Sequence, residues 1–297
     1  MNLRKIKRIL NKENISYQSN VSLLNKNSFR LNSLAKIYIE INSKSELLKV
    51  LKVLKEYNFN YFILGRGSNI LLTKKIYKMI FIKLNFKDSI YRYKNNVLVC
   101  GNCLNSTLSS FLMMNGLGGF EFASCIPGSI AGGVYMNASY KDKSFSDIVR
   151  YVEIIDENLN VRWLSNKEMN FTYRSSIVKS KKYVICRVIF AFYEEEKKAI
   201  KDKILLLQNN KLLTQPIDEF SAGCVFKNNI FKAYKCIIGV GLVNKEINGA
   251  LFSNKHANFI VNRNNASGKS ILKLIKLAKK KVLKKYKIIL EEEIEIL

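Results

Sequence analysis

Histidine, proline and clustered metal ligands are scarce in this sequence. His256 is the only histidine among 297 residues, and there are two prolines. A structural zinc site normally takes four closely spaced Cys or His ligands. The six cysteines offer one C-x-x-C pair, Cys100 and Cys103, with neither a second pair nor a histidine cluster. The sequence therefore argues against structural zinc. A redox-active dithiol stays open as an alternative to two unrelated thiols.

Long apolar runs are also absent. No stretch approaches the ~20 apolar residues of a membrane-spanning helix. The first 20 residues are basic but lack the uninterrupted apolar core of a signal peptide. We therefore expect a cytoplasmic protein that does not enter a membrane.

Acidic residues are outnumbered by basic ones, 23 to 50, which gives a formal net charge of +27. Such a charge favours anionic partners, including nucleic acid. However, the lysines are spread along the whole chain and accompany many Asn and Ile residues, which indicates a chain-wide compositional bias. A basic surface would equally attract a dinucleotide or a nucleotide sugar. We expect no dedicated nucleic-acid function, and a basic nucleic-acid-binding protein stays the alternative.

The first 84 residues read as a small α/β unit. Residues 37–41 alternate as a strand does. Ser43 and Glu46 have the spacing of a capping box, and a helix with one apolar face follows. Residues 61–64 are a short apolar strand that leads into a glycine-containing turn.

Residues 85–195 are richer in strands. We expect strands at 97–100, 151–155, 161–164 and 184–192, with a hairpin turn at 156–160. Ser165 and Glu168 form a second possible capping box.

Residues 196–297 form a third region. A connecting helix is expected over 194–213, and strand-like segments at 221–228 and 257–261. A lysine-rich helix over 270–286 has apolar residues at helical spacing, so its lysines are interpreted as a solvated face.

Two loops of small residues could approach a ligand closely. The first is Gly65-Arg66-Gly67-Ser68-Asn69, directly after a strand, and the second is residues 126–133, Ile-Pro-Gly-Ser-Ile-Ala-Gly-Gly. Glycine allows tight bends, and successive N–H groups in such a turn can bind phosphate. The first loop does not match the dinucleotide fingerprint G-x-G-x-x-G. Two such loops in separate regions suggest a pyrophosphate held between them.

Three further segments carry candidate reactive side chains. Arg174 lies between hydroxyl-bearing neighbours and could bind a carboxylate through its planar fork, although a surface arginine is the simpler interpretation. Cys224 lies beside Gly223 in a turn of small residues, where a buried, inert thiol is the commoner case. The acidic residues 291–295 look like a solvated tail.

Taken in order, these segments resemble one enzyme family. They include Asn27-Ser28-Phe29, the Gly65–Asn69 loop, Ile126–Ser129, Met136-Asn137-Ala138, Tyr173-Arg174-x-Ser176, Ser221–Asn228, Lys255–Asn262 and Leu290-Glu291-x-Glu293-Ile294. From about residue 25 onward, this series is similar to the motifs of the UDP-N-acetylenolpyruvoylglucosamine reductases. Each motif is modest alone, and their joint order is specific.

The resemblance implies an α+β protein, with a two-domain FAD-binding fold of the vanillyl-alcohol-oxidase type and a smaller α+β substrate-binding domain. The predicted domains are residues 1–84 and 85–195 for FAD and 196–297 for substrate. Some proteins of this fold attach FAD covalently through a histidine. No histidine precedes position 256 in this chain, so FAD is expected to be bound non-covalently. The residues expected to bind it are Gly65, Arg66, Gly67, Ser68, Asn69, Pro127, Gly128, Ser129, Gly132 and Asn137.

The resemblance also implies the reaction. NADPH reduces FAD, and UDP-N-acetylglucosamine enolpyruvate then takes a hydride at its terminal alkene carbon to give UDP-N-acetylmuramate, a peptidoglycan precursor. Arg174 matches the family arginine that would stabilise the developing negative charge. Glu293 matches a glutamate that acts through a hydrogen bond or a proton. Cys224 stands where the family usually has a serine proton donor, and a thiol is the better acid.

The residues expected to bind the nucleotide sugar are Tyr173, Lys211, Lys227 and Asn228. A monomer is expected. Two enzyme-related alternatives stay open, namely another flavin oxidoreductase on the same fold and an inactive reductase. The chemically competent trio Arg174, Cys224 and Glu293 argues against a different oxidoreductase.

Overall fold

The computed structural model describes residues 3–87, 90–228 and 231–297. The chain divides into two compact units. The larger unit comprises residues 1–19, 37–66 and 78–209, and the smaller one comprises residues 20–36, 67–77 and 210–297. Among the helices of the described segments, none combines the length and the apolar composition needed to span a bilayer.

The N-terminal part of the fold centres on a four-stranded sheet of order β1-β2-β5-β3. Its strands are β1 (Gln18–Ser22), β2 (Leu34–Ile41), β3 (Tyr61–Ile63) and β5 (Ile76–Leu84). Helices α1 (Leu3–Lys12) and α2 (Lys44–Glu56) pack on it through an aliphatic core. The strands and the helix predicted here are confirmed.

Helix α2 begins at the predicted cap. The Ser43 hydroxyl accepts a hydrogen bond from the Glu46 N–H at 3.1 Å, while the Glu46 carboxylate accepts one from the Asn42 N–H at 2.8 Å. The glutamate therefore reaches one residue further back than in the standard capping box. At the second predicted box, Ser165 and Glu168 make both reciprocal bonds, but the residues that follow form a turn and no α-helix.

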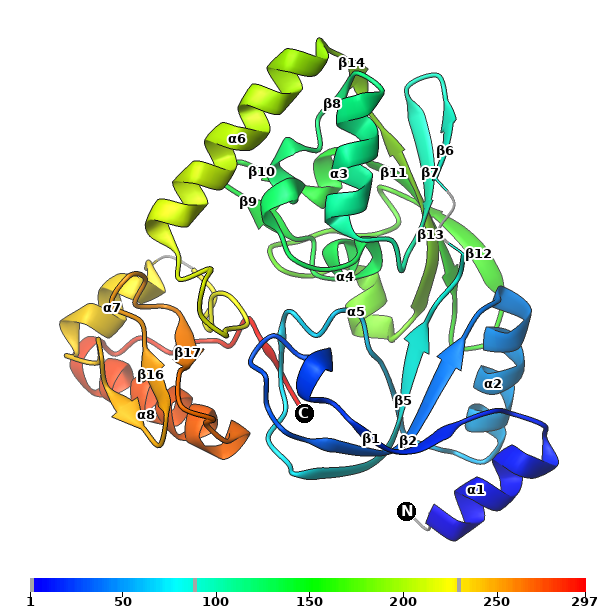
Figure 1. Ribbon diagram of the computed structural model, residues 1–297, viewed down its shortest axis with the longest axis horizontal. Helices are drawn as coiled ribbons and strands as arrows, with labels where there is room; N and C mark the ends of the chain where they lie inside the picture. The colour runs from blue at the N-terminus through cyan, green and yellow to red at the C-terminus, as the bar shows by residue number, and fades with distance from the viewer. Residues whose placement is uncertain (1–2, 88–89, 229–230) are drawn as a thin grey trace. The chain divides into compact units, whose positions relative to one another are not determined.

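A five-stranded antiparallel sheet forms the second core, in the order β12-β11-β13-β7-β6 (Figure 1). Its strands are β6 (Ile90–Tyr93), β7 (Asn96–Cys100), β11 (Val149–Ile155), β12 (Val161–Ser165) and β13 (Val184–Ala191). The last four match the predicted strands within two residues. Helices α3 (Asn105–Met114) and α4 (Ile130–Tyr135) pack on one face of this sheet.

Phenylalanine side chains fix α4 in this core. Phe120, Phe145 and Phe190 pack edge to face with centroids about 6 Å apart. A Cβ atom on Gly133 would lie 2.3 Å from the Phe145 ring. Gly133 therefore permits the close packing that positions the loop before α4.

Short elements complete this part of the chain. They are β8 (Leu117–Gly118), β9 (Ser139–Tyr140), β10 (Lys143–Ser144), β14 (Tyr193–Glu194), α5 (Ile177–Lys181) and the 3₁₀ turns η2 (Glu121–Cys125) and η3 (Phe145–Asp147). Helix α6 (Lys197–Thr214) then connects the two units along the chain and begins three residues later than predicted.

The smaller unit has a three-stranded antiparallel sheet, β15 (Glu246–Ile247), β16 (Ala250–Phe252) and β17 (Ile260–Asn262). Helix α8 (Gly268–Tyr286) packs on it and is capped by the Ser267 hydroxyl. The remaining elements are η1 (Leu24–Lys26), α7 (Ala233–Gly239), β4 (Ile70–Leu71) and β18 (Glu295–Ile296). Strands β4 and β18 pair in parallel, so the acidic C-terminal segment is built into the unit and is not the solvated tail expected above.

Candidate active site

The start of the first glycine loop, Gly65, lies beside the second loop within the larger unit. A Cβ atom on Gly65 would lie 3.4 Å from the Ser129 Oγ atom. Ser129 caps α4, because its hydroxyl accepts a hydrogen bond from the Gly132 N–H at 3.3 Å. Gly65 and Ser129, one from each predicted loop, are therefore neighbours in the larger unit.

Several backbone N–H groups of the second loop already donate hydrogen bonds within the protein. The Ile130 N–H donates to the Cys103 carbonyl at 2.9 Å, and the Ala131 N–H donates to the Gly101 carbonyl at 2.8 Å. The N–H groups of Gly128 and Ser129 have no acceptor among the residues that the structure describes. In this loop, those two groups are the ones left for an anionic ligand.

The first loop is different. We call Gly65–Asn69 the binding loop. Within the described ranges 3–87, 90–228 and 231–297, none of its five successive N–H groups has an acceptor. Such a run of backbone donors forms a nest for phosphate oxygens. The donor chemistry fits the pyrophosphate of FAD.

Gly67 is required for the shape of the binding loop. Its φ angle is +67°, and a Cβ atom there would lie 2.2 Å from the Lys26 carbonyl oxygen. Its own carbonyl accepts a hydrogen bond from the Ser28 N–H at 3.0 Å. The Asn27-Ser28-Phe29 motif thus supports the loop from within the smaller unit.

The Asn137 side chain connects two other segments of the larger unit. With a φ of +40°, it donates from its side chain to the Thr172 carbonyl at 3.1 Å and accepts from the Ser146 N–H at 2.9 Å. The structure thus places its amide on protein groups, and its predicted contact with FAD stays a prediction. Pro127 is exposed on the second loop.

Arg174 is held in a strained turn of the larger unit. Its φ is +57°, its Nη1 donates to the Ser139 hydroxyl at 2.6 Å, and its guanidinium lies 5.3 Å from the centre of the Tyr173 ring. The Ser176 hydroxyl fixes the turn by donating to the Tyr135 carbonyl at 2.9 Å. These contacts hold the guanidinium in one orientation.

The smaller unit joins the segments of Cys224 and Glu293. We call Cys224–Lys227 the reactive segment. The Glu293 N–H donates to the Val225 carbonyl at 2.8 Å, and the Lys227 N–H donates to the Glu291 carbonyl at 2.9 Å. Both Cys224 and Glu293 are half-buried. The structure therefore brings together these two of the three predicted catalytic residues.

Asn258 clamps the reactive segment from its other side. Its side chain accepts from the Phe226 N–H at 3.0 Å and donates to the Phe226 carbonyl at 2.8 Å. Its backbone carbonyl accepts from the Val225 N–H at 2.8 Å. No role for Asn258 is predicted from the sequence, although it lies in the Lys255–Asn262 motif. The available signal was a single amide between Ala257 and the apolar run Phe259–Val261.

Asn69 links the binding loop to the same cluster. Its side chain donates to the Glu293 carbonyl at 3.1 Å, and its own carbonyl accepts from the Glu295 N–H at 2.9 Å. Within the smaller unit, the end of the binding loop and the glutamate segment are therefore one hydrogen-bonded structure.

His256 supports the clamp. Its Nδ1 accepts from the Asn258 N–H at 3.3 Å, and its ring packs 4.8 Å from that of Phe259. Burial lowers the pKa of His256 below its ordinary value. The ring is consequently neutral at neutral pH, with the acceptor nitrogen toward the backbone.

The predicted substrate-binding residues lie in three settings. Lys227 pairs with Glu291 at 3.2 Å, and the Asn228 side chain accepts from the Ala233 N–H at 3.0 Å. Lys211 lies in the last turn of α6, and Tyr173 is exposed beside Arg174. Their contacts with a nucleotide sugar stay predictions.

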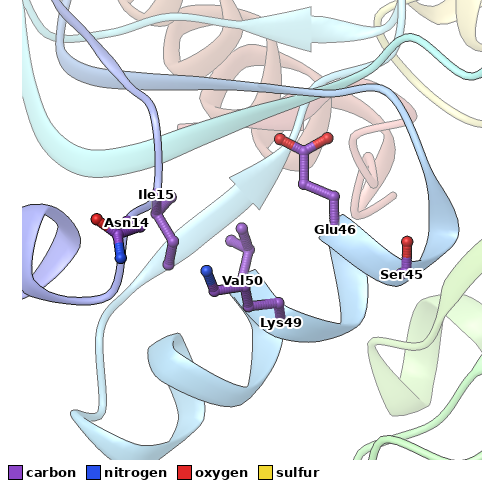
Figure 2. Close-up of a pocket in the computed structure, with 6 residues that line it drawn as sticks. All are labelled: Asn14, Ile15, Ser45, Glu46, Lys49 and Val50. Carbon is purple, nitrogen blue, oxygen red and sulfur yellow. The ribbon is translucent and has the colours of Figure 1, made fainter.

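None of the residues predicted to bind cofactor or substrate or to act in catalysis lines the pocket drawn in Figure 2. That cavity of about 310 Å³ lies between the segment after α1 and helix α2, and Glu46 and Lys49 contribute to its rim. In the described residues, no group of three His, Cys, Asp or Glu side chains could hold a metal ion.

Comparisons with known proteins agree on both regions. The family model described as FAD binding domain matches residues 35–165, and the one described as UDP-N-acetylenolpyruvoylglucosamine reductase, C-terminal domain, matches residues 215–297. A reductase of that name from Clostridium perfringens is 36% identical over 270 residues, which cover 91% of this chain and 89% of the relative. Another from Pelagibacter ubique is 34% identical, with both chains fully covered.

A solved structure is similar as well. The crystal structure of UDP-N-acetylenolpyruvylglucosamine reductase from Thermus caldophilus superposes with a TM-score of 0.82 at 26% sequence identity. The match covers 95% of this chain and 99% of that one.

Proposed function

Because the chain belongs to the UDP-N-acetylenolpyruvoylglucosamine reductase family, we propose that it reduces UDP-N-acetylglucosamine enolpyruvate to UDP-N-acetylmuramate with FAD and NADPH. The expected α+β class is confirmed, as is the combination of an FAD-binding fold with a C-terminal domain. The single observation that supports the chemistry most directly is the 2.8 Å hydrogen bond from the Glu293 N–H to the Val225 carbonyl, next to Cys224.

FAD fits the donors that the chain offers. The five N–H groups of the binding loop, which have no acceptor in the part of the chain that the structure describes, are suited to phosphate oxygens. The N–H groups of Gly128 and Ser129 in the larger unit are suited to the same chemistry. Gly65 and Gly132 keep the surface around Ser129 free of side chains. The bound flavin supplies the hydride. We keep the predicted cofactor contacts, from Gly65 through Asn137, as part of this proposal.

Arg174 is proposed to stabilise charge on the substrate. Addition of a hydride to the terminal alkene carbon leaves negative charge on the carbon beside the carboxylate. A guanidinium already oriented by Ser139 and Tyr173 can stabilise that charge without reorganising. Its planar fork also suits the carboxylate itself.

Cys224 is proposed to donate the proton that completes the reaction. The thiol proton moves to the carbon beside the carboxylate, and the thiolate is then reprotonated from solvent. Glu293 is proposed to hydrogen-bond the reacting group or to return the proton. The clamp by Asn258 keeps the reactive segment in one geometry, which proton transfer to carbon requires.

The remaining assignments belong to the same proposal. Tyr173, Lys211, Lys227 and Asn228 bind the nucleotide sugar, and the cofactor domains are residues 1–84 and 85–195, followed by a substrate domain at 196–297. The enzyme acts as a cytoplasmic monomer.

The test is a visible absorption spectrum of the purified protein without oxygen. The proposal predicts a flavin band that NADPH bleaches and that UDP-N-acetylglucosamine enolpyruvate restores. Protein that is colourless and does not bind added FAD would contradict it. Bleaching by NADPH without restoration by the enolpyruvyl sugar would favour another flavin oxidoreductase.

A further inference from the structure

The five-stranded sheet has one face that is only partly covered. Its other face packs on α3 and α4. At one end of the partly covered face, Ile155 and Val184 pack into the aliphatic core with α2. At the opposite end, Tyr91 is 63% exposed, Tyr93 72% and Tyr151 49%. Three tyrosine rings therefore face solvent on one sheet.

The strand register places these rings around a common floor. Tyr91 pairs with Leu98, Leu98 with Ile189, and Ile189 with Tyr151, so the four side chains form one row across β6, β7, β13 and β11. Directly paired residues share a sheet face. Three strand spacings separate the two tyrosines, about 14 Å. The rings of Tyr91 and Tyr151 thus lie on either side of the aliphatic side chains of Leu98 and Ile189.

A hollow of about 500 Å³ occupies this place. Tyr91, Tyr93 and Tyr151 line it together with Leu98, Ile189 and Arg150. Its volume lies in the ordinary range for small-molecule sites. None of the residues assigned to the reductase reaction lines it.

A bulge directs a cation into the hollow. The register of β11 against β13 shifts between Val149 and Tyr151, so Arg150 is the extra residue. Bulges re-aim side chains and are frequent beside functional sites. Across the described ranges, the Arg150 guanidinium has no acceptor or carboxylate partner. It is available to an anion.

The nearby carboxylates are already paired. Glu153, on the same sheet face, accepts from Arg187 at 2.8 and 2.7 Å and from Lys44 at 2.9 Å. Glu194 lies 3.6 Å from Arg92, which also lines the hollow. The hollow therefore combines exposed aromatic rings with a net positive charge.

We propose that this hollow binds a nucleobase linked to phosphate. The base lies on Leu98 and Ile189 and stacks on Tyr91 or Tyr151, and the Arg150 guanidinium pairs with the phosphate. Aromatic rings stack on any base, and arginine forms a planar fork to phosphate oxygens. A free nucleotide and a single-stranded nucleic acid both supply this chemistry.

The test uses FAD-saturated protein at about 0.15 M ionic strength, where a chain of this charge binds polyanions less indiscriminately. The probes are AMP and a short fluorescein-labelled oligothymidylate. We expect at least one of Tyr91→Ala and Tyr151→Ala, the one that removes the stacking ring, to weaken binding at least about fivefold, because base stacking on an aromatic ring contributes 1–3 kcal/mol by alanine substitution. Tyr91→Phe keeps the ring and should bind like the parent.

Charge has its own matched control. Arg150→Ala should weaken binding more than Lys52→Ala, which removes an exposed cation from α2 in the same unit. Displacement of the oligothymidylate by AMP identifies a nucleotide site, and binding of the oligothymidylate alone identifies a single-strand site. Thermal unfolding of each variant checks that it is folded.

Three results would overturn the proposal. The first is that neither probe binds the parent. The second is that both alanine variants at tyrosine bind like the parent while Arg150→Ala and Lys52→Ala lose affinity equally, which would be charge-driven binding. The third is that sedimentation shows the parent self-associating and the tyrosine variants monomeric, because the face would then be covered by a second copy.

Discussion

The binding loop, which contains two glycines, and the reactive segment, which follows Gly223, are both short and carry predicted site residues, but their backbone N–H groups are used in opposite ways. The binding loop leaves five successive N–H groups without an acceptor in the described residues. In the reactive segment, the N–H groups of Val225, Phe226 and Lys227 all donate within the protein. N–H groups without an acceptor within the protein can bind a ligand. N–H groups that donate within the protein instead fix the backbone, which holds the Cys224 thiol in place.

The largest expected effect comes from adding one methyl group to the binding loop. Gly67→Ala places a Cβ atom 2.2 Å from the Lys26 carbonyl oxygen at a φ of +67°. We expect loss of the flavin band and a destabilisation of at least ~3 kcal/mol in chemical unfolding.

The matched control is Gly241→Ala, at a glycine that has no predicted contact with FAD. Its φ is +65°, close to that of Gly67, but a Cβ atom there would meet nothing within 4 Å. This variant should keep its flavin and lose only ~1–2 kcal/mol of stability, the cost of the left-handed backbone. Equal flavin content in the two variants would remove the distinction drawn for the binding loop.

The next effect concerns the thiol of the reactive segment. Cys224→Ala should lower kcat by about 10²- to 10⁴-fold while the flavin spectrum and its bleaching by NADPH stay normal, because proton donation is lost and the cofactor site is untouched. Cys224→Ser should keep much of the activity. An alanine variant as active as the parent would exclude Cys224 as the essential donor.

The clamp on the reactive segment should have a smaller effect. Asn258→Ala removes two hydrogen bonds to Phe226, each buried, and should cost about 2–3 kcal/mol of stability. We also expect kcat to fall more than KM rises, since the thiol is no longer held in place. Asn254→Ala, an exposed amide four residues earlier, is the control and should match the parent. A change in KM alone would make Asn258 a substrate contact.

The smallest effect is a pH dependence of stability. Burial holds the folded-state pKa of His256 below its ordinary value of about 6.5. The unfolded chain therefore binds more protons, and the free energy of unfolding falls as pH drops from about 6.5 through the folded pKa, by at most ~1.4 kcal/mol per pH unit. His256 is the only histidine, so His256→Gln should remove this slope. An unchanged slope in that variant would assign it to carboxylates.

Many helices and strands could be predicted from the sequence because the patterns that specify them are local. Strand alternation located β7, β11, β12 and β13, and the Ser43 cap located α2. The segment 221–228 was expected to be strand-like, but Cys224 and Phe226 make only isolated bridges, to Phe259 and Glu292. Those partners lie 30 or more residues away in the chain, so no local pattern could indicate them.

The sequence motifs identified candidate site residues, but they did not predict the hydrogen-bond partners of those residues. The motif order pointed to Arg174, Cys224 and Glu293, while the separate roles of the two glycine loops depend on distant acceptors such as the Gly101 and Cys103 carbonyls. The same holds for the acidic C-terminal segment, whose pairing with β4 links residues more than 200 positions apart. Composition alone suggested a solvated tail there.

Product analysis in D₂O tests the central claim most directly. With NADPH and UDP-N-acetylglucosamine enolpyruvate, we predict that NMR of the product shows UDP-N-acetylmuramate with deuterium on the carbon beside the carboxylate, since an exchangeable thiol delivers that hydrogen. The absence of UDP-N-acetylmuramate, in protein that carries FAD and is bleached by NADPH, would contradict the reductase function.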